Sequence, residues 1–303
     1  MRKTILGTAL CVICVACNPN PPTPDPEEDV EQSMPIEVAA EEDLQRTLPE
    51  LSDMLSAGQI SSVALVAGYL DRIERLDRSG PTLRAVLTIN PDAMAQAEAS
   101  DIRRKTDRSL GPLDGLPVLL KDNIETLDPM PTTAGSTALQ DNVTGRDSPL
   151  AAGLRAQGAV ILGKTNLSQW ANIRSSNSSS GWSSLGGQVR NPHVLDRNPC
   201  GASSGAGAAI AASLAAGAVG SETNGSIICP SNVNGIVGFK PTVGIISQEL
   251  IVPISFSQDT AGPMTKTVRG AALMMNAMAA GEAQQDYVTA LDKNSLAGKR
   301  IGV

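Results

Sequence analysis

Residues 115–122 read GLPVLLKD, an apolar run that ends directly in a lysine and an aspartate. A short continuous apolar run is typical of a strand that is buried on both faces of a sheet. We therefore expect a buried strand over residues 116–120, with Lys121 at its carboxyl end. Such a strand needs a covering layer on each side, so the flanking segments decide the fold class.

Helix and strand signals alternate on both sides of this run. Helical periodicity or a Ser or Pro start signal is present at residues 43–57, 63–76, 91–105, 148–157, 205–216 and 271–280. Short apolar runs indicate strands at residues 159–162 and 218–220, with further strand material at 235–240 and 243–246. This alternation predicts an α/β fold.

The composition restricts the classes of partner. The net charge is −7 and the chain has no basic stretch, which argues against nucleic acid as a partner. Aromatic residues make up 2% of the chain, whereas glycine and alanine are plentiful. Because small residues let backbones approach closely, we expect tight packing of helices on the sheet.

The first residues are typical of an export signal. A charged start, residues 1–3, precedes an apolar stretch over residues 5–16 that is too short for an ordinary membrane helix. The stretch resembles a bacterial lipoprotein signal, in which residues 1–16 are removed and Cys17 becomes the lipidated first residue. A plain secretory signal is the alternative. Both interpretations predict export to the cell envelope or periplasm, with membrane contact only through the N-terminal lipid.

The two ends of the chain lead to further expectations. Residues 17–35 are rich in proline and acidic residues and predict an extended tether ahead of the folded part, residues 36–303. Residues 298–303 are typical of a strand that is starting, so we expect a further C-terminal part of the domain. Within the folded part, an oxidising compartment would allow Cys200 and Cys229 to pair, and the sequence alone leaves this open.

A single histidine restricts the possible hydrolytic mechanisms. His193 lies in a proline-bounded loop without a nucleophile elbow, and a surface histidine is the better interpretation. A hydrolase built on this chain therefore needs another base. Lys121 can serve if burial keeps it neutral. The alternative is a strand-end lysine whose ammonium group reaches solvent.

Two loops of small residues are candidates for nucleophilic and anion-binding groups. Residues 200–207 contain Ser203 and Ser204, and residues 220–230 contain Ser226. Such loops can direct backbone N–H groups at an anion or bring a serine close to a substrate. Flexible linkers are the alternative, but the apolar helix expected between the two loops must be buried, which argues against linkers.

The order and spacing of these motifs resemble the amidase-signature family. The lysine motif at residues 115–124 and the nucleophile motif at 220–230 are accompanied by family-like motifs at 132–136, 163–166, 238–244 and 257–264. The similarity runs from about residue 40 to the end, and residues 166–172 are most similar to the peptide amidase branch. The resemblance implies a central mixed sheet flanked by helices on both faces, of which this chain carries the N-terminal portion.

The resemblance also implies a Ser–Ser–Lys triad that cleaves a linear carboxamide, with a peptide C-terminal amide as one candidate substrate. Ser226 would attack the carbonyl, a serine of the first loop would relay the proton, and neutral Lys121 would accept it. The oxyanion hole would consist of the backbone N–H groups of Thr223, Asn224, Gly225 and Ser226. The products would be a carboxylic acid and ammonia or an amine, without a metal or organic cofactor.

One position departs from the family pattern. By the spacing usual in the family, the relay serine falls on Ala202, which has no hydroxyl. Ser203, one position later, is a candidate relay after a local shift, and a water molecule or Ser204 is a second candidate. The third interpretation is an impaired, amidase-like protein that binds an amide without cleaving it.

Two other assignments follow from the same resemblance. Lys164 and Lys240 lie in family-like motifs that do not carry the base, and we expect both to be structural. The subunit that transamidates charged tRNA shares this signature. Its work is cytoplasmic, so the expected export and the acidic charge argue against that role here.

Overall fold

The computed structural model describes residues 37–292, 297–300 and 302. The expected signal peptide, Cys17 and the tether lie outside the described residues, so these assignments stay predictions. The chain divides into two units, residues 1–35 and residues 36–303, and the second unit contains all of the described structure. Of the strand expected over residues 298–303, the described residues 298–300 and 302 are not in a strand.

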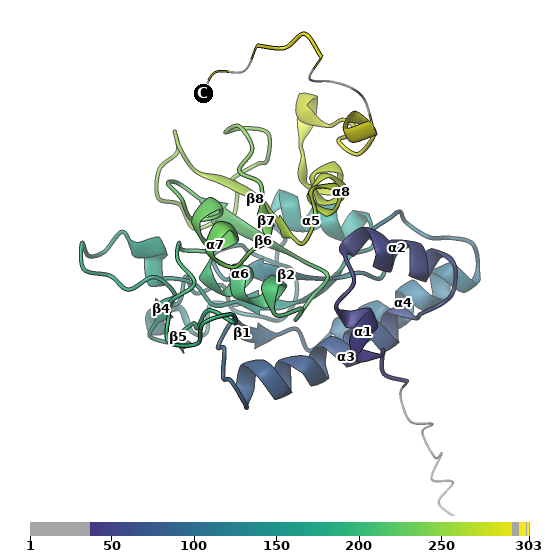
Figure 1. The fold of residues 1–303 in the computed structure, drawn as a ribbon, viewed down its shortest axis with the longest axis horizontal. Helices are drawn as coiled ribbons and strands as arrows, with labels where there is room; N and C mark the ends of the chain where they lie inside the picture. Colours follow the sequence, from purple (N-terminus) through teal and green to yellow (C-terminus); the bar gives the residue numbers. More distant parts are fainter. Residues whose placement is uncertain (1–36, 293–296, 301, 303) are drawn as a thin grey trace, which may run out of the picture. The chain divides into compact units, whose positions relative to one another are not determined.

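A six-stranded mixed sheet forms the centre of the fold (Figure 1). In spatial order its strands are β1 (Val86–Ile89), β3 (Val160–Thr165), β2 (Pro117–Lys121), β6 (Gly217–Glu222), β8 (Thr260–Thr265) and β7 (Val237–Gly238). Strand β2 runs parallel to its two neighbours, β3 and β6. The other pairs are antiparallel. The apolar run of β2 is therefore an inner strand, which explains why all its residues are buried.

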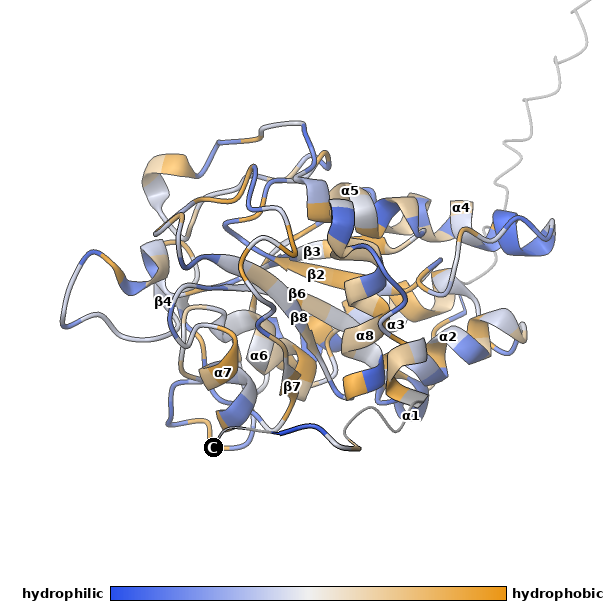
Figure 2. Cartoon of the chain, turned by 90° about the horizontal axis from the view of Figure 1, so that it is seen from above, coloured by the Kyte–Doolittle hydropathy of each residue, from blue (hydrophilic) through white to orange (hydrophobic). Residues whose placement is uncertain are grey.

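Helices cover both faces of this sheet. They are α1 (Glu41–Leu44), α2 (Leu48–Ser56), α3 (Ser62–Ile73), α4 (Ala93–Lys105), α5 (Pro149–Ala156), α6 (Ser204–Ala211), α7 (Ile228–Val233) and α8 (Val268–Met278). Gly217 of β6 faces Met274 of α8, whereas Gly220 of the same strand faces Ser203, directly before α6. Positions three apart in a strand point to opposite faces. Figure 2 shows the apolar strands β2 and β3 among the surrounding helices. The sheet with helices on both faces confirms the predicted α/β fold.

Small residues let α6 lie close to the sheet. A Cβ added to Gly205 would lie 2.3 Å from the carbonyl oxygens of Ala85 and Asn166, so no side chain fits there. The helix is almost entirely buried, as expected for an apolar helix between two loops. The tight packing predicted from the glycine and alanine content is therefore present.

Several element boundaries follow the start signals in the sequence. The Ser61 side chain accepts a hydrogen bond from the Ala64 N–H at the start of α3, and Ser148 does the same for Ala151 at the start of α5. The helix expected over residues 43–57 is split in two. A capping box of Thr47 and Glu50 starts the new helix α2.

One expected strand is absent, and two strands of the sheet, β1 and β8, were not predicted. Residues 243–246 form a turn, because Gly244 has a φ of +95° and the Ile245 N–H donates to the Thr242 carbonyl at 3.1 Å. Strand β8 was not predicted, since its Gly262-Pro263 pair is typical of a turn. Pairing with β6 and β7, which are distant in sequence, overrides that local signal.

Short elements complete the described part of the chain. A π-helical turn, η1 (Glu74–Arg78), continues α3, and the 3₁₀ turns are η2 (Thr137–Leu139), η3 (Gln169–Asn172), η4 (Gly281–Ala283) and η5 (Thr289–Asp292). A small hairpin of β4 (Trp182–Ser183) and β5 (Gly187–Gln188) lies within the Ser-rich loop. Among the described residues, every helix is too short or too polar to cross a bilayer.

Candidate active site

The sheet brings two chemically active strand ends together. Strands β2 and β6 are parallel neighbours, with Leu120 in register with Val219, so both strands end at the same edge. Lys121 is the last residue of β2, and Ser221 and Glu222 are the last residues of β6. The carboxyl ends of adjacent parallel strands are a common place for a binding crevice. Residues about a hundred positions apart in sequence therefore meet here.

Lys121 is fully buried at this edge. Its Nζ donates to the carbonyl oxygen and to the hydroxyl oxygen of Ser221, at 3.0 Å each. Burial lowers the pKa of Lys121 to about 7, although the charges of Glu222 and Asp259 act in the opposite direction. The alternative of a lysine that reaches solvent is therefore wrong, and a large share of this amine is neutral near pH 7.

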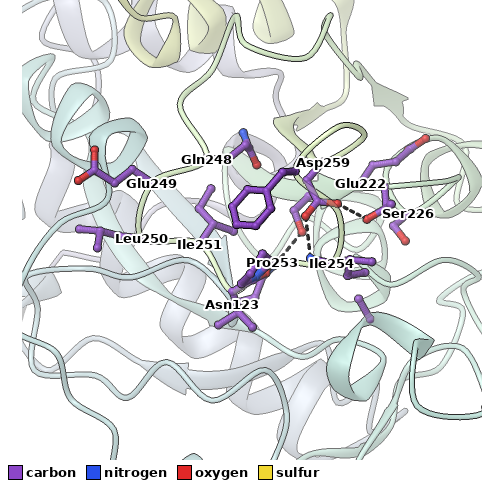
Figure 3. A pocket seen from close by; sticks show the side chains of 15 residues that line it. Asn123, Glu222, Ser226, Gln248, Glu249, Leu250, Ile251, Pro253, Ile254 and Asp259 are labelled. Carbon is purple, nitrogen blue, oxygen red and sulfur yellow. Dashed lines mark hydrogen bonds between the residues drawn. The ribbon is translucent and has the colours of Figure 1, made fainter.

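Ser226 lies on a pocket of about 250 Å³ next to this strand edge (Figure 3). The half-buried serine follows β6 in the loop that leads into α7, and its carbonyl oxygen accepts the Ser203 N–H at 3.1 Å. The lining residues are Asn123, Ala171, Ser221, Glu222, Thr223, Ser226, Gln248, Glu249, Leu250, Ile251, Val252, Pro253, Ile254, Phe256 and Asp259. The predicted nucleophile thus shares a pocket with the serine that binds the predicted base.

A buried carboxylate organises the loop around Ser226. Glu222 accepts hydrogen bonds from the N–H groups of Gly225, Ile227 and Ile228, at 2.7, 2.6 and 2.9 Å. The Glu222 side chain therefore fixes the loop and caps the N-terminus of α7. The Gly225 N–H donates to Glu222, so it is not available to an oxyanion, and the expectation for Gly225 was wrong. The N–H groups of Thr223, Asn224 and Ser226 stay candidates.

Two further polar residues of the site were missed in the sequence. The Asn123 amide donates to the Ser221 hydroxyl at 2.9 Å. Asp259 accepts from the Thr223 hydroxyl at 2.5 Å and from the backbone N–H groups of Ile254 and Ser255, at 2.7 and 2.9 Å. Asp259 thereby ties the pocket wall to the loop that carries Ser226. The position of Asn123 just after the lysine strand was the one signal that could have pointed to it.

Ser203 lies in a closed environment behind Ser221. It is fully buried, and its hydroxyl donates to the Ser221 carbonyl at 3.1 Å and accepts the Ser221 N–H at 3.2 Å. Ala202 is also buried, and its carbonyl accepts the Ser168 N–H at 3.1 Å. Ser204 starts α6 and donates to the carbonyl oxygens of residues 200 and 201. The structure thus places both candidate relay serines against main-chain groups.

The other titratable candidates lie away from the pocket lining. Lys164 is buried, and its Nζ donates to the Ile124 carbonyl at 2.5 Å and to the Thr132 hydroxyl at 2.9 Å. Burial lowers its pKa to about 8, and the charge of Asp122 opposes that shift. Lys240 is half-buried. His193 is exposed, as predicted, with Nε2 2.9 Å from the Asn234 carbonyl oxygen.

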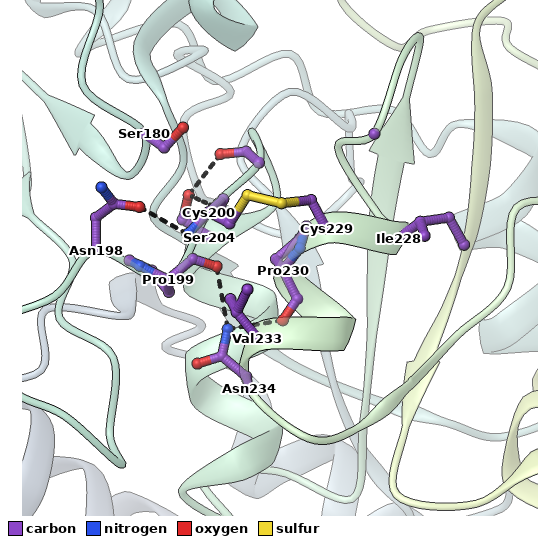
Figure 4. The surroundings of a disulfide bond; sticks show 12 residues. Ser180, Asn198, Pro199, Cys200, Ser204, Ile228, Cys229, Pro230, Val233 and Asn234 are labelled. Carbon is purple, nitrogen blue, oxygen red and sulfur yellow. Dashed lines mark hydrogen bonds between the residues drawn. A yellow bond between two sulfur atoms is a disulfide. The ribbon is translucent and has the colours of Figure 1, made fainter.

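A disulfide joins the two small-residue loops (Figure 4). Cys200 precedes α6, Cys229 lies in the first turn of α7, and their Cα atoms are 5.7 Å apart. The bond fixes the loop of Ser203 relative to the helix that follows Ser226. The sequence left this pairing open. Within the described ranges, no three His, Cys, Asp or Glu side chains gather in a way that could hold a metal ion.

Comparison with known proteins identifies relatives of this chain. The Amidase family model matches residues 64–303. A putative amidase of Arthroderma benhamiae is 44% identical over 258 residues, which is 81% of this chain and 43% of that protein. A glutamyl-tRNA(Gln) amidotransferase subunit from Methylobacillus flagellatus is 39% identical over 270 residues, covering 86% of this chain and 53% of that protein.

A solved structure of an amidase is also similar to this chain. The native peptide amidase of Stenotrophomonas maltophilia superposes with a TM-score of 0.79 at 49% identity, covering 81% of this chain and 52% of the peptide amidase. The chain therefore spans about half the length of the relatives it matches. The similarity includes the segments that carry Lys121 and Ser226, because the family match covers both.

Proposed function

This chain belongs to the amidase family, and on that premise we propose that it hydrolyses a linear carboxamide to a carboxylic acid and ammonia or an amine. The observation that carries the proposal is the buried Lys121 amine, which is bound to Ser221 beside the pocket that also exposes Ser226. A lysine with a pKa near 7 can act as a general base at neutral pH. No histidine is needed for this chemistry.

In the proposed reaction Ser226 is the nucleophile and Lys121 is the final proton acceptor. Ser226 attacks the amide carbonyl, and an acyl-enzyme forms when the C–N bond breaks. Backbone N–H groups of Thr223, Asn224 and Ser226 stabilise the oxyanion. The structural support is the Glu222 carboxylate, which fixes the geometry of this loop before substrate arrives.

The pocket lining favours an uncharged acyl group. Leu250, Ile251 and Phe256 give it apolar walls, whereas its charged residues are all acidic: Glu222, Glu249 and Asp259. A free carboxylate would be repelled here, and a neutral carboxamide would not. Together with the similarity to a peptide amidase, this favours a peptide C-terminal amide as the substrate.

The direct test is release of ammonia from a panel of linear amides and peptide amides by the full-length protein. We expect wild type to hydrolyse at least one of them and Ser226→Ala to lose essentially all activity. Ser62→Ala, which removes a buried hydroxyl that donates to the Gly115 carbonyl, is the control for loss of a serine hydroxyl and is expected to retain activity. Equal rates for wild type and Ser226→Ala would overturn the proposal.

The second candidate is a binding protein that has lost turnover, and Ala202 is the observation that favours it. In such a protein the pocket still binds an amide, but the hydroxyl required for proton transfer is missing. Ala202→Ser would then create or greatly raise amide hydrolysis in a protein that is otherwise inactive. A wild type that hydrolyses amides at rates typical of enzymes would exclude this candidate.

We further propose that the protein is exported and anchored to the cell envelope through Cys17. The pattern of residues 1–17 motivates this, and the Cys200–Cys229 disulfide supports an oxidising compartment. The acidic net charge also disfavours a tRNA substrate. Fractionation of cells expressing the tagged protein tests the proposal: we expect membrane association that Cys17→Ser abolishes. A cytoplasmic location would revive the transamidation role.

A further inference from the structure

We propose that the Ser221 hydroxyl is the proton relay between Ser226 and Lys121. This inference rests on the proposed function and names a catalytic residue within it. Ser221 is the only residue in the described part of the chain that both hydrogen-bonds Lys121 Nζ through a side-chain hydroxyl and lines the pocket of Ser226. The resemblance to known amidases assigned the relay to the loop over residues 200–207 instead.

The hydrogen bonds around Ser221 leave its hydroxyl suited to move a proton. The Lys121 amine lies 3.0 Å from the Ser221 carbonyl oxygen and 3.0 Å from its hydroxyl oxygen. A neutral amine can donate one N–H to the carbonyl and turn its lone pair to the hydroxyl. The Ser221 O–H then donates to Lys121, which leaves the oxygen as an acceptor.

Asn123 holds this acceptor in place. Its amide nitrogen lies just beyond the end of β2 and donates to the Ser221 hydroxyl oxygen at 2.9 Å. A serine oxygen has two acceptor sites, so one remains for the Ser226 O–H after Asn123 has used the other. Asn123 also lines the pocket, and it acts as a positioning residue in this arrangement.

The serine hydroxyls of residues 200–207 form their hydrogen bonds with main-chain groups. Ser203 Oγ both donates to the Ser221 carbonyl and accepts the Ser221 N–H, and it is absent from the residues that line the pocket. Ser204 Oγ bonds two carbonyl oxygens of its own loop, at 2.8 Å each. Ala202 has no hydroxyl. Ser203 therefore supports the backbone of Ser221 and leaves the proton transfer to Ser221.

The proposed steps balance. Ser221 gives its proton to the Lys121 lone pair and takes the Ser226 proton, while Ser226 Oγ bonds to the amide carbon. When the C–N bond breaks, Lys121 returns a proton through Ser221 to the leaving nitrogen, which departs as ammonia or an amine. Water then attacks the acyl-enzyme ester, its proton takes the same route to Lys121, and Ser226 regains a proton as the ester bond breaks.

The test compares serine variants of the full-length protein in two assays: amide hydrolysis, and the rate at which a fluorophosphonate labels Ser226. We expect Ser221→Ala to slow both by about 10²-fold or more, the usual contribution of a positioned proton-transfer group. Ser221→Thr keeps a hydroxyl and should recover most of the rate. Ser203→Ala should cost far less than Ser221→Ala, and Ser62→Ala is the control for loss of a buried hydroxyl.

Two readouts separate proton transfer from structural damage. The rate of labelling should rise with pH through about 7 in wild type and in Ser221→Thr, because the neutral form of Lys121 is the base. Ser221→Ala should lose this rise while its melting temperature stays close to that of Ser62→Ala. Labelling of Ser221→Ala at the wild-type rate would overturn the relay and leave the proposed function standing. If wild type shows neither labelling nor hydrolysis, the proposed function and the relay fall together.

Discussion

The Lys121 amine lies 3.0 Å from two atoms of Ser221, the carbonyl oxygen and the hydroxyl oxygen. This relationship joins the ends of two parallel strands that are neighbours in the sheet and distant in sequence. When the Lys121 amine is protonated, both Ser221 oxygens accept its hydrogen bonds. When the amine is neutral, the Ser221 O–H can donate to its lone pair. The same contact therefore stabilises the site and prepares it for proton transfer.

Replacing Lys121 with methionine should remove activity without unfolding the protein. We expect kcat/KM to fall by about 10²- to 10⁴-fold, because the variant has no proton acceptor. Methionine has a similar length, and the Ser221 carbonyl and hydroxyl oxygens keep the Ser203 hydroxyl and the Asn123 amide as donors, so the melting temperature should not fall by more than a few degrees. Kinetics and thermal unfolding on the same preparations check both parts. An active Lys121→Met enzyme would contradict the assigned base.

The pH dependence of kcat/KM should follow the neutral form of Lys121. Burial lowers the pKa of this amine to about 7. A base works only when unprotonated, so the rate should rise about tenfold per pH unit below 7 and level off above about 8. A neutral amide substrate keeps substrate ionisation out of the profile. A flat profile between about pH 5 and 9 would contradict the prediction.

Replacing Lys164 with methionine should affect stability more than chemistry. The lysine binds the Ile124 carbonyl and the Thr132 hydroxyl, and its charge opposes the rise in the pKa of Asp122, which burial brings to about 6. Loss of the lysine leaves the buried Thr132 hydroxyl oxygen without this donor and Asp122 without its neighbouring positive charge, at a cost of about 1–3 kcal/mol in the free energy of unfolding. Urea denaturation measures this. A rate loss as large as that of Lys121→Met, in folded protein, would make Lys164 a rival base.

The sequence predicted the strand before Lys121, the serine loop and the helix α6 that precedes this loop, because each has a local signal, whereas helix α7 after Ser226 was not predicted. Apolar runs, caps and glycine-rich loops act over a few residues. The partners of Ser221 could not be predicted in that way. Asn123 and Ser221 meet only because β2 and β6 are adjacent. Strand β8 forms although its Gly262-Pro263 pair is typical of a turn. Long-range strand pairing decides these contacts.

The same reasoning applies to the relay. In the sequence, the relay residue can be located only by its spacing from Ser226. That spacing falls on Ala202, and Ser203 is one position later. The structure adds direction: the Ser203 hydroxyl binds the main chain of Ser221, whereas the Ser221 hydroxyl binds Lys121 and Asn123. A hydroxyl's direction depends on three-dimensional neighbours that no spacing rule contains.

Replacing Glu222 with glutamine should loosen the nucleophile loop and shift the pH profile. The neutral amide weakens the charge-assisted bonds to the Gly225, Ile227 and Ile228 N–H groups, at a cost of about 1–3 kcal/mol in stability. The Glu222 charge also raises the pKa of Lys121. Its removal should therefore move the rise of kcat/KM to lower pH while lowering the plateau. A shift to higher pH would contradict this electrostatic assignment.

The Cys200–Cys229 disulfide should stabilise the fold and the geometry of both serine loops. The two cysteines are separated by 29 positions. Closing a loop of this size is worth about 3.5 kcal/mol by the chain-entropy estimate. We expect the Cys200→Ser, Cys229→Ser double variant to unfold at a lower urea concentration and to lose activity at temperatures where wild type is stable. Wild type treated with a thiol reductant should behave like the double variant, and the double variant itself should not respond to the reductant. If the variant keeps the stability and the rate of wild type, the bond has no structural role in the site.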